Sequence, residues 1–312
     1  MLMRRRFRAI VLLAAVLPTA AAFAKHMYEY TDKSGIHHFT DIKPPDTVTG
    51  VRSKLIHTDP QPLIGTREDG TDDNRQIVFI NSAGGPVSVE ISMRESANIR
   101  TEPVLPARFV IAPLGETPGL RTRPINLHQP YQYQLSYRYV PGDYRARVDP
   151  DATYHLPFPG EDRFPVSQGF NGKFSHHDEQ NRYAVDIVMP VGTPVLAARG
   201  GVIMTVANDF YGAGLNMDKY GDRANNIRIL HADGSMAVYA HLELESARVQ
   251  VGDHVHAGQV LALSGDTGFT NGPHLHFCVQ TNNDMKLVSV PFQFSGPDGE
   301  FIPKRGMILG GD

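Results

Sequence analysis

The chain is 312 residues long, which corresponds to one large domain or to two or three small ones. Charged residues make up 20% and hydrophobic residues 41% of it, which excludes a wholly disordered chain and a multi-span membrane protein. The formal net charge of −3 speaks against a nucleic-acid partner.

Residues 1–24 predict a secretory signal peptide. Four arginines precede an apolar run at residues 9–17, and the small residues Ala22 and Ala24 end the segment. This run is too short to span a bilayer of about 30 Å comfortably, although an uncleaved anchor is the alternative. Removal of the segment leaves 26 Lys+Arg against 33 Asp+Glu, a net charge of −7. We therefore expect an exported protein with no transmembrane segment in the mature chain.

Cys278 is the single cysteine of the chain, so no intrachain disulfide can form. A single cysteine is compatible with export but does not indicate it, because an oxidising compartment would add no intrachain disulfide to this fold. The 288 residues that follow the predicted signal are enough to bury a core without one.

Residues 25–57 predict a small β-hairpin module. Aromatic and β-branched residues at 26–31 and 36–40 flank a turn that contains Ser34 and Gly35. The pattern Tyr-x-Tyr-Thr-Asp, a glycine turn, His-Phe-Thr-Asp and a Pro-Pro pair resembles a small exported proteobacterial module of unknown function. The resemblance implies an exported protein, but it does not imply any catalytic or binding activity for this module.

Residues 58–74 are polar and rich in proline and glycine, which predicts a linker. Beyond it, residues 87–94 and 131–139 alternate strictly between apolar and polar side chains, as half-buried antiparallel strands do. With the apolar runs at 77–80 and 108–111, residues 75–150 predict a small β-sandwich. The tyrosine stripe at 131–139 is interpreted as a core face rather than as a glycan-binding platform.

The remaining part, residues 155–312, is also β-rich and contains nine of the fourteen histidines. In the segment Gly272-Pro273-His274-Leu275-His276-Phe277, a strand would place His274 and His276 on one face and the apolar side chains on the other. Two imidazoles about 7 Å apart at Cα can converge on one ion. A second His-x-His pair, His254 and His256, lies in a turn-rich segment and is interpreted as surface.

Three further segments add polar side chains to apolar strands. Asp186 interrupts a run that reads as buried, and a carboxylate there is costly unless it is paired or bound to metal. His241 ends another apolar strand, and the adjacent His176 and His177 lie upstream of Asp186. Cys278 would share a strand face with His276, so a thiolate ligand is conceivable, but a packed thiol is the preferred interpretation.

Together these segments resemble the lysostaphin/LytM-type zinc endopeptidases, which cut peptidoglycan peptides. The resemblance covers about residues 165–280, in the order of the family. The matching residues are His176 with Ala184-Val185-Asp186-Ile187; Gly192-Thr193-Pro194-Val195 with Ala197-Ala198; Tyr239-Ala240-His241-Leu242; Gly252-Asp253-x-Val255-x-x-Gly258-Gln259; and Thr267-Gly268 with Gly272-Pro273-His274-Leu275-His276-Phe277.

The resemblance implies one Zn²⁺ per chain, held by His176, Asp186 and His276. It also implies that His241 and His274 are non-ligating histidines at the reaction centre, with their separate roles left open. Nine residues separate His176 from Asp186, where the shorter family pattern has three, so His177 remains a rival ligand. Three protein ligands leave a fourth position for water, which is the catalytic arrangement.

The function implied is a zinc metalloendopeptidase that hydrolyses peptidoglycan stem-peptide crosslinks in the periplasm or cell envelope of a Gram-negative bacterium. In such an envelope the family resemblance implies cleavage of the D-alanyl–diaminopimelate crossbridge. The alternative is a non-catalytic wall-binding regulator of other hydrolases, which the complete set of candidate ligands argues against. A third possibility keeps the mechanism and changes the substrate to Gly-rich peptides.

Overall fold

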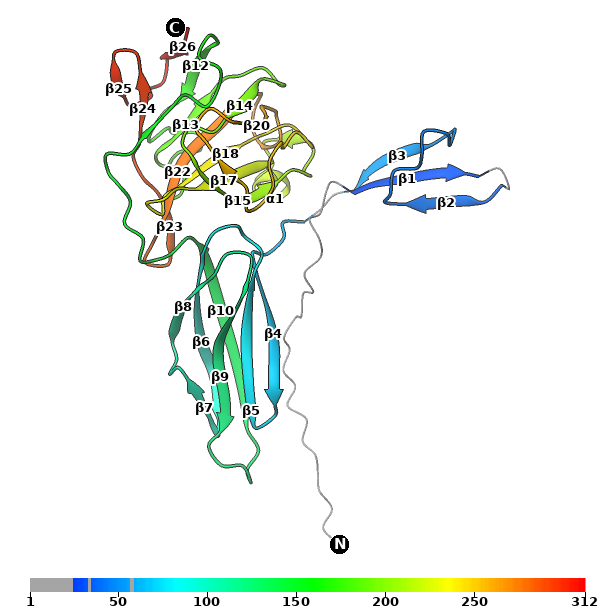
Figure 1. Cartoon of the computed structure of the whole chain (residues 1–312), viewed down its shortest axis with the longest axis vertical. Coiled ribbons are helices and arrows are strands. Elements are labelled where there is room, and N and C mark those ends of the chain that lie inside the picture. The colour runs from blue at the N-terminus through cyan, green and yellow to red at the C-terminus, as the bar shows by residue number, and fades with distance from the viewer. Residues whose placement is uncertain (1–24, 33–34, 57–58, 312) are drawn as a thin grey trace.

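The computed structural model describes residues 25–32, 35–56 and 59–311. Within them the chain forms three β-rich units that follow one another in the sequence (Figure 1). The expected mainly β fold with antiparallel sheets is confirmed. The predicted signal peptide at residues 1–24 lies outside the described residues. No helix in the described part of the chain is long and apolar enough to cross a membrane.

The N-terminal unit is a three-stranded sheet with the strand order β2-β1-β3. Its strands are β1 (Lys25–Thr31), β2 (His37–Thr40) and β3 (Arg52–Ile56). Strands β1 and β2 form the expected hairpin, in which the rings of Tyr30 and His38 stack with their centroids 4.8 Å apart. Strand β3 is not among the predicted elements, because its sequence shows no alternation of apolar and polar residues.

The second unit consists of a four-stranded sheet, order β4-β5-β9-β7, and a three-stranded sheet, order β10-β6-β8. Apolar side chains from both sheets meet in one core, as in a β-sandwich. The strands are β4 (Ile64–Thr71), β5 (Asn74–Asn81), β6 (Val87–Ala97), β7 (Ile99–Glu102), β8 (Ala107–Ile111), β9 (Glu116–Pro124) and β10 (Gln132–Pro141).

The structure differs from the expected linker at residues 58–74. Residues 64–71 form β4, and Asp72 begins the turn into β5. Strand β4 lies at the edge of its sheet, where charged side chains are tolerated because one side of the strand is open to water. Glu68 of β4 illustrates this, since its carboxylate pairs with Arg75 of β5 at 2.6 Å.

The tyrosine stripe of β10 faces the sandwich core only in part. The register between β10 and β6 shifts at Gln134 and Leu135, which pair with Glu95 and Met93, so the extra residue is Arg94 of β6 and the alternation along β10 continues. Tyr139 packs against the core, whereas Tyr137 is 40% exposed and contacts the ring of Phe79 edge-on.

The third unit contains a nine-stranded sheet with the order β19-β15-β17-β18-β22-β13-β12-β26, in which β23 also pairs with β22. Its strands are β12 (Arg163–Gln168), β13 (Ala184–Ile187), β15 (Gly201–Ala207), β17 (Asn226–Leu230), β18 (Met236–Ala240), β19 (His254–Val255), β22 (Leu275–Asn283), β23 (Lys286–Ser289) and β26 (Ile308–Gly310).

Short strands surround this sheet. Strand β11 (Thr153–Tyr154) pairs with β24 (Gln293–Gly296), which pairs with β25 (Gly299–Phe301). Strand β14 (Pro194–Leu196) pairs with β20 (Val260–Leu263), and β16 (Ala213–Gly214) pairs with β21 (Gly268–Phe269). The one helix among the described residues is α1 (Met217–Tyr220). The third unit thus includes residues just before the expected boundary at 155.

Alternation along the central strands separates an apolar face from a polar face. Val185, Phe277 and Tyr239 point into the main core of the unit. The intervening positions Asp186 and His276 therefore point to the opposite face of the sheet, which carries the candidate site.

The second and third units pack closely against each other. Met204 and Met236 of the third unit belong to the core of the sandwich. Gly84 donates its N–H to the carbonyl of Met204 at 2.9 Å, and a Cβ atom there would lie 2.2 Å from a backbone oxygen of β15. Asn282 also donates to the carbonyl of Gly142 at 3.1 Å. This junction requires glycine at position 84.

We predict that His231 makes the stability of the fold pH-dependent. Its ring is 2% exposed, and Nδ1 donates to the carbonyl of Gly200 at 2.8 Å. Burial lowers the pKa of His231 to about 4. Its neutral ring therefore contributes stability in full above pH about 6.5, and that contribution is lost as the pH falls towards 4.

The expected loss is about 2 kcal/mol of unfolding free energy between pH 7 and pH 5. Urea unfolding of metal-free protein at the two pH values measures it. The substitution His231→Leu should remove this part of the pH dependence, whereas His254→Leu at an exposed position should retain it. Identical pH dependence in the wild type and in His231→Leu would contradict the prediction.

Candidate metal centre

Asp186 and His276 lie opposite each other on the paired strands β13 and β22. All four residues of β13 are buried, and Asp186 is 6% exposed. A carboxylate at such a position requires compensating partners, because its desolvation is otherwise costly. One partner is His276, which the pairing of β13 with β22 places opposite Asp186. The others come from the end of β12 and from the loop that precedes β13.

The loop at residues 169–176 brings His176 to the same point. His176 follows a turn closed by its own N–H, which donates to the carbonyl of Gly172 at 3.0 Å. Gln168, at the end of β12, accepts hydrogen bonds from the N–H of Phe174 at 3.0 Å and of Ser175 at 3.4 Å. The same side chain donates to Asp186 Oδ2 at 2.9 Å. Gln168 thus joins the loop to the carboxylate.

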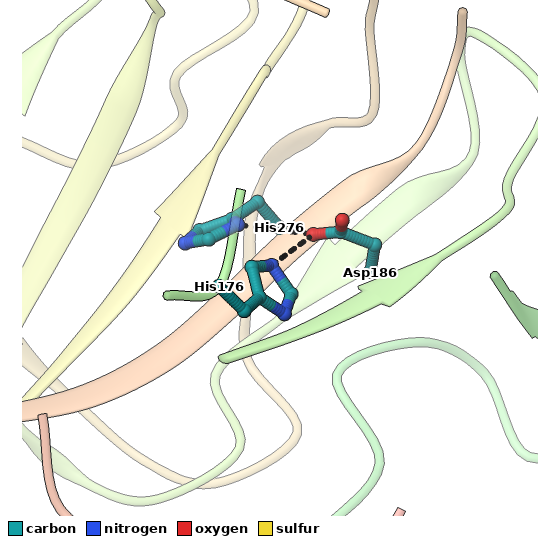
Figure 2. Close-up of side chains that lie close together, drawn as sticks. All are labelled: His176, Asp186 and His276. Atoms are coloured by element: carbon teal, nitrogen blue, oxygen red, sulfur yellow. Dashed lines mark hydrogen bonds and ion pairs between the residues drawn. The ribbon is translucent and has the colours of Figure 1, made fainter. Parts of the chain in front are cut away.

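One oxygen of Asp186 is shared by both histidines. Oδ1 lies 3.1 Å from Nε2 of His176 and 3.0 Å from Nδ1 of His276. Figure 2 shows the two imidazoles converging on the carboxylate. One candidate ligand atom from each of the three residues lies within 4.8 Å of the other two.

The hydrogen bonds of His176 indicate that a cation belongs at this point. Its Nδ1 faces the carbonyl of Gly169 at 3.0 Å and must donate, because a carbonyl oxygen only accepts. In the neutral ring Nε2 then carries a lone pair that faces the Asp186 oxygen. Two lone pairs at this distance repel each other unless a proton or a metal ion lies between them.

The charges of the site agree with this interpretation. Burial acts to raise the pKa of Asp186, but the hydrogen bonds from His176 and His276 outweigh burial and hold it well below 3.8. Burial acts to lower the pKa of His176, but Asp186 outweighs it and raises the value above 6.5. The site therefore holds a fixed negative charge next to nitrogen ligands.

The three residues fit Zn²⁺ in both chemistry and spacing. Imidazole nitrogens and carboxylate oxygens bind zinc at about 2.0–2.2 Å, so two ligands of a tetrahedral ion lie about 3.3 Å apart. The separations of 3.0 and 3.1 Å from Asp186 Oδ1 are close to that value. In metal sites a ligand histidine is typically anchored by a hydrogen bond from its other ring nitrogen, and the Gly169 carbonyl provides such a bond for the candidate ligand His176.

His241 lies directly after β18, with a backbone φ of 64°. Its Nδ1 faces the carbonyl of Thr267 at 2.7 Å and therefore donates, which leaves Nε2 as an acceptor. Burial, followed by the proximity of His274 and His276, lowers the pKa of His241 to about 3. His241 is thus held as the neutral ring.

His274 adjoins both His241 and the carboxylate. Its ring centroid is 4.5 Å from that of His241, and its Nε2 lies 3.7 Å from Asp186 Oδ1. Nδ1 faces the carbonyl of Gly272 at 2.9 Å, so Nε2 is again the free nitrogen. Two histidines with fixed tautomers therefore lie beside the candidate metal ligands.

A cleft of about 850 Å³ opens above the site. A second cleft of about 860 Å³ meets it at Asp186 and extends past residues 302–305. The first cleft is floored by β17, β18 and β22 and bounded by the loops at 174–181 and 269–274, with α1 at one edge. An extended peptide thus has room on both sides of Asp186.

The structure places the other candidates elsewhere. His177 is exposed, and it is not one of the three residues whose candidate ligand atoms lie close together. Adjacent residues of the turn point in different directions, so His176 reaches Asp186 and His177 does not. Cys278 is fully buried, its Sγ donates to the carbonyl of Gln180 at 3.4 Å, and burial raises the pKa of the thiol. His254 and His256 are exposed, as expected of surface residues.

Gln168 is a site residue that the sequence analysis did not identify. A glutamine at the end of a strand carries no spacing pattern that marks it as a partner of a carboxylate 18 residues away. The only available signal is the glycine that follows it, which begins the loop to His176.

Residues 180–287 match the model of a family described as Peptidase family M23. The glycyl-glycine endopeptidase ALE-1 of Staphylococcus capitis is 37% identical over 119 residues, which are 38% of this chain and 28% of that protein. The peptidoglycan DD-endopeptidase ShyA of Vibrio cholerae is 30% identical over 158 residues, 47% of this chain and 34% of that protein. The chain thus spans about a third or less of these relatives.

The solved structures that are similar to this chain include the catalytic domain of lysostaphin from Staphylococcus simulans. Its sequence is 30% identical to this chain. The match covers 39% of this chain and 81% of the lysostaphin domain, with a TM-score of 0.28. Residues 180–287 are a peptidase family M23 domain of the lysostaphin/LytM type.

Proposed function

We propose that this chain is an exported zinc metalloendopeptidase that hydrolyses peptide crosslinks of peptidoglycan. The observation that carries the proposal is the convergence of His176, His276 and Asp186 on one point, with one candidate ligand atom from each residue within 4.8 Å of the others. The names of the relatives support it, since one is a glycyl-glycine endopeptidase and another a peptidoglycan endopeptidase.

His176, Asp186 and His276 would hold one Zn²⁺ and leave its fourth position open to water, as in catalytic sites. Zinc bound there would supply a water of pKa near 7 and polarise the scissile carbonyl. Gln168 orients the Asp186 carboxylate through Oδ2, which leaves Oδ1 directed at the two histidines.

His241 and His274 would move the protons. Their Nδ1 atoms donate to backbone carbonyls, so each neutral ring presents Nε2 as a proton acceptor. One ring accepts the proton of the attacking water, and the resulting imidazolium can donate it to the leaving amine. A protonated ring in this position also stabilises the negative charge that develops on the carbonyl oxygen. The two rings together supply the base and the acid that peptide hydrolysis requires.

The relatives suggest two substrate classes. Crosslinked stem peptides are the first, and Gly-rich peptides are the second, because one relative is named for glycyl-glycine bonds. Both are peptides cut by the same chemistry. The resemblance of residues 25–57 to an exported proteobacterial module favours an envelope with thin peptidoglycan. In such an envelope the family resemblance implies the stem-peptide crosslink, including the D-alanyl–diaminopimelate bond.

We predict that purified residues 25–312 bind about one zinc per chain. The variants His176→Ala and Asp186→Asn should lose it, because the first removes a ligand nitrogen and the second removes the negative charge that attracts the ion. His177→Ala should retain it, since His177 is exposed and outside the group. Metal analysis after dialysis measures the content, and loss of zinc in His177→Ala with retention in His176→Ala would reverse the assignment.

We predict that His274→Ala and His241→Ala retain zinc and lower the rate of hydrolysis by about 10²- to 10⁴-fold, the usual size of a general acid–base contribution. Conversion of crosslinked muropeptide dimers to monomers measures the rate, with a pentaglycine peptide as the second substrate. His256→Ala, an exposed surface variant, is the matched control. An unmutated protein with neither zinc nor cleavage would favour the non-catalytic regulator.

We predict that Gln168→Leu weakens zinc binding by about 10- to 100-fold, as the loss of an outer hydrogen bond to a ligand does. The variant leaves Asp186 Oδ2 and two loop N–H groups without their partner. Zinc titration against a competing chelator gives the affinity. Gln250→Leu, at an exposed position, should keep the wild-type value, and an equal affinity in Gln168→Leu would exclude the positioning role.

A further inference from the structure

Arg228 lies in the floor of the cleft, on the same face of the sheet as the metal centre. It pairs with Val238 of β18, which in turn pairs with Cys278 of β22. The neighbouring row of the sheet runs through Ala240 and His276 to Asp186. Because side chains two residues apart on a strand share a face, Arg228 and His276 both point into the cleft.

Among the residues that the structure describes, the guanidinium of Arg228 has one hydrogen-bond partner, and that partner is neutral. Its Nη1 donates to Gln280 Oε1 at 2.7 Å, and Gln280 Nε2 donates to the carbonyl of Gln180 at 2.9 Å. These two bonds fix the amide of Gln280 and hold the guanidinium across Val238. A guanidinium has five N–H donors in a planar fork, so most of this fork remains available.

No carboxylate among the described residues lies within ion-pair distance of Arg228. Two other partly buried arginines differ in this respect, since Arg75 pairs with Glu68 at 2.6 Å and Arg199 with Asp233 at 3.2 Å. Asp178 and Asp222 line the same cleft, but the Asp178 carboxylate accepts hydrogen bonds from its own loop. Burial without an acidic partner lowers the pKa of Arg228 to about 10. A partly buried cation is costly unless an anion joins it.

The spacing along β22 relates this cation to the reaction centre. Cys278 is two residues and Gln280 four residues beyond His276, which corresponds to about 7 and 13 Å along a strand. The guanidinium lies above this stretch, because it reaches from β17 across β18 to Gln280. An extended peptide covers the same span with two to four residues.

We infer that Arg228 is a specificity-determining residue that binds a free carboxylate of the substrate peptide, two to four residues from the scissile bond. This inference rests on the proposed function and adds the chemical class that the cleft selects. A carboxylate accepts two parallel N–H bonds from a guanidinium, which gives both charge compensation and a fixed register. Stem peptides with free side carboxylates satisfy this requirement, whereas stem peptides with amidated side carboxylates and internal pentaglycine bridges have no side carboxylate.

The test compares a stem tetrapeptide that has free side carboxylates with the same peptide after amidation. Calorimetry on metal-free protein gives the dissociation constant for each peptide, and hydrolysis of the matching crosslinked dimers by zinc-loaded protein gives kcat and KM. The variants are Arg228→Gln and Arg228→Lys. Arg248→Gln, an exposed arginine outside the cleft, is the matched control.

The wild type should bind the free-carboxylate peptide about tenfold more tightly than the amidated peptide. Arg228→Gln should raise KM and the dissociation constant about tenfold for the free-carboxylate peptide only, with a smaller change in kcat. Arg228→Lys should recover part of the affinity, because it restores the charge without the fork. Arg248→Gln should match the wild type.

Equal binding of the two peptides by the wild type would overturn the inference without reference to any variant. A loss of affinity for both peptides alike in Arg228→Gln would also overturn it, since that result indicates a structural role. Failure of the zinc-loaded wild type to cleave either dimer would instead contradict the proposed endopeptidase, and the binding preference of the metal-free protein would still decide the role of Arg228.

Discussion

The burial of the Asp186 carboxylate is the constraint on which the rest of the site depends. A charged oxygen on a fully buried strand must be compensated locally. The compensation comes from three separate elements: β22 through His276, the loop after β12 through His176, and the end of β12 through Gln168. The same convergence that makes the carboxylate tolerable assembles a set of ligands of the kind that zinc prefers.

Backbone carbonyls then fix the chemistry of three rings. Gly169, Thr267 and Gly272 each accept a hydrogen bond from the Nδ1 atom of a histidine. Because an imidazole with a proton on Nδ1 exposes a lone pair on Nε2, the nitrogen that each ring presents is determined by uncharged backbone carbonyls in loops. The glycine-rich composition of these loops allows their carbonyls to approach the rings closely.

The parts of this arrangement that follow a regular period could be predicted from the sequence. Alternation along β22 places His276 opposite the apolar face, and the apolar run around Asp186 marks a buried acid. Strand β4 could not be predicted from a regular period, because an edge strand tolerates a polar sequence that resembles that of a linker. The bulge at Arg94 in β6 and the contacts of Gln168 also could not be predicted from the linear sequence, since both depend on which segments become neighbours.

The long segment between His176 and Asp186 connects the metal centre to the charge in the cleft floor. It lengthens the sequence spacing between the two candidate ligands, yet His176 still reaches Asp186 Oδ1 at 3.1 Å. The carbonyl of Gln180, within this segment, accepts hydrogen bonds from Gln280 and Cys278, so the segment lies along β22. Gln280, oriented by that bond, directs its oxygen at Arg228. This segment thus forms a wall of the cleft and orients the guanidinium through Gln280. If Arg228 has the role proposed above, the length of the segment bears on substrate selection as well as on the position of His176.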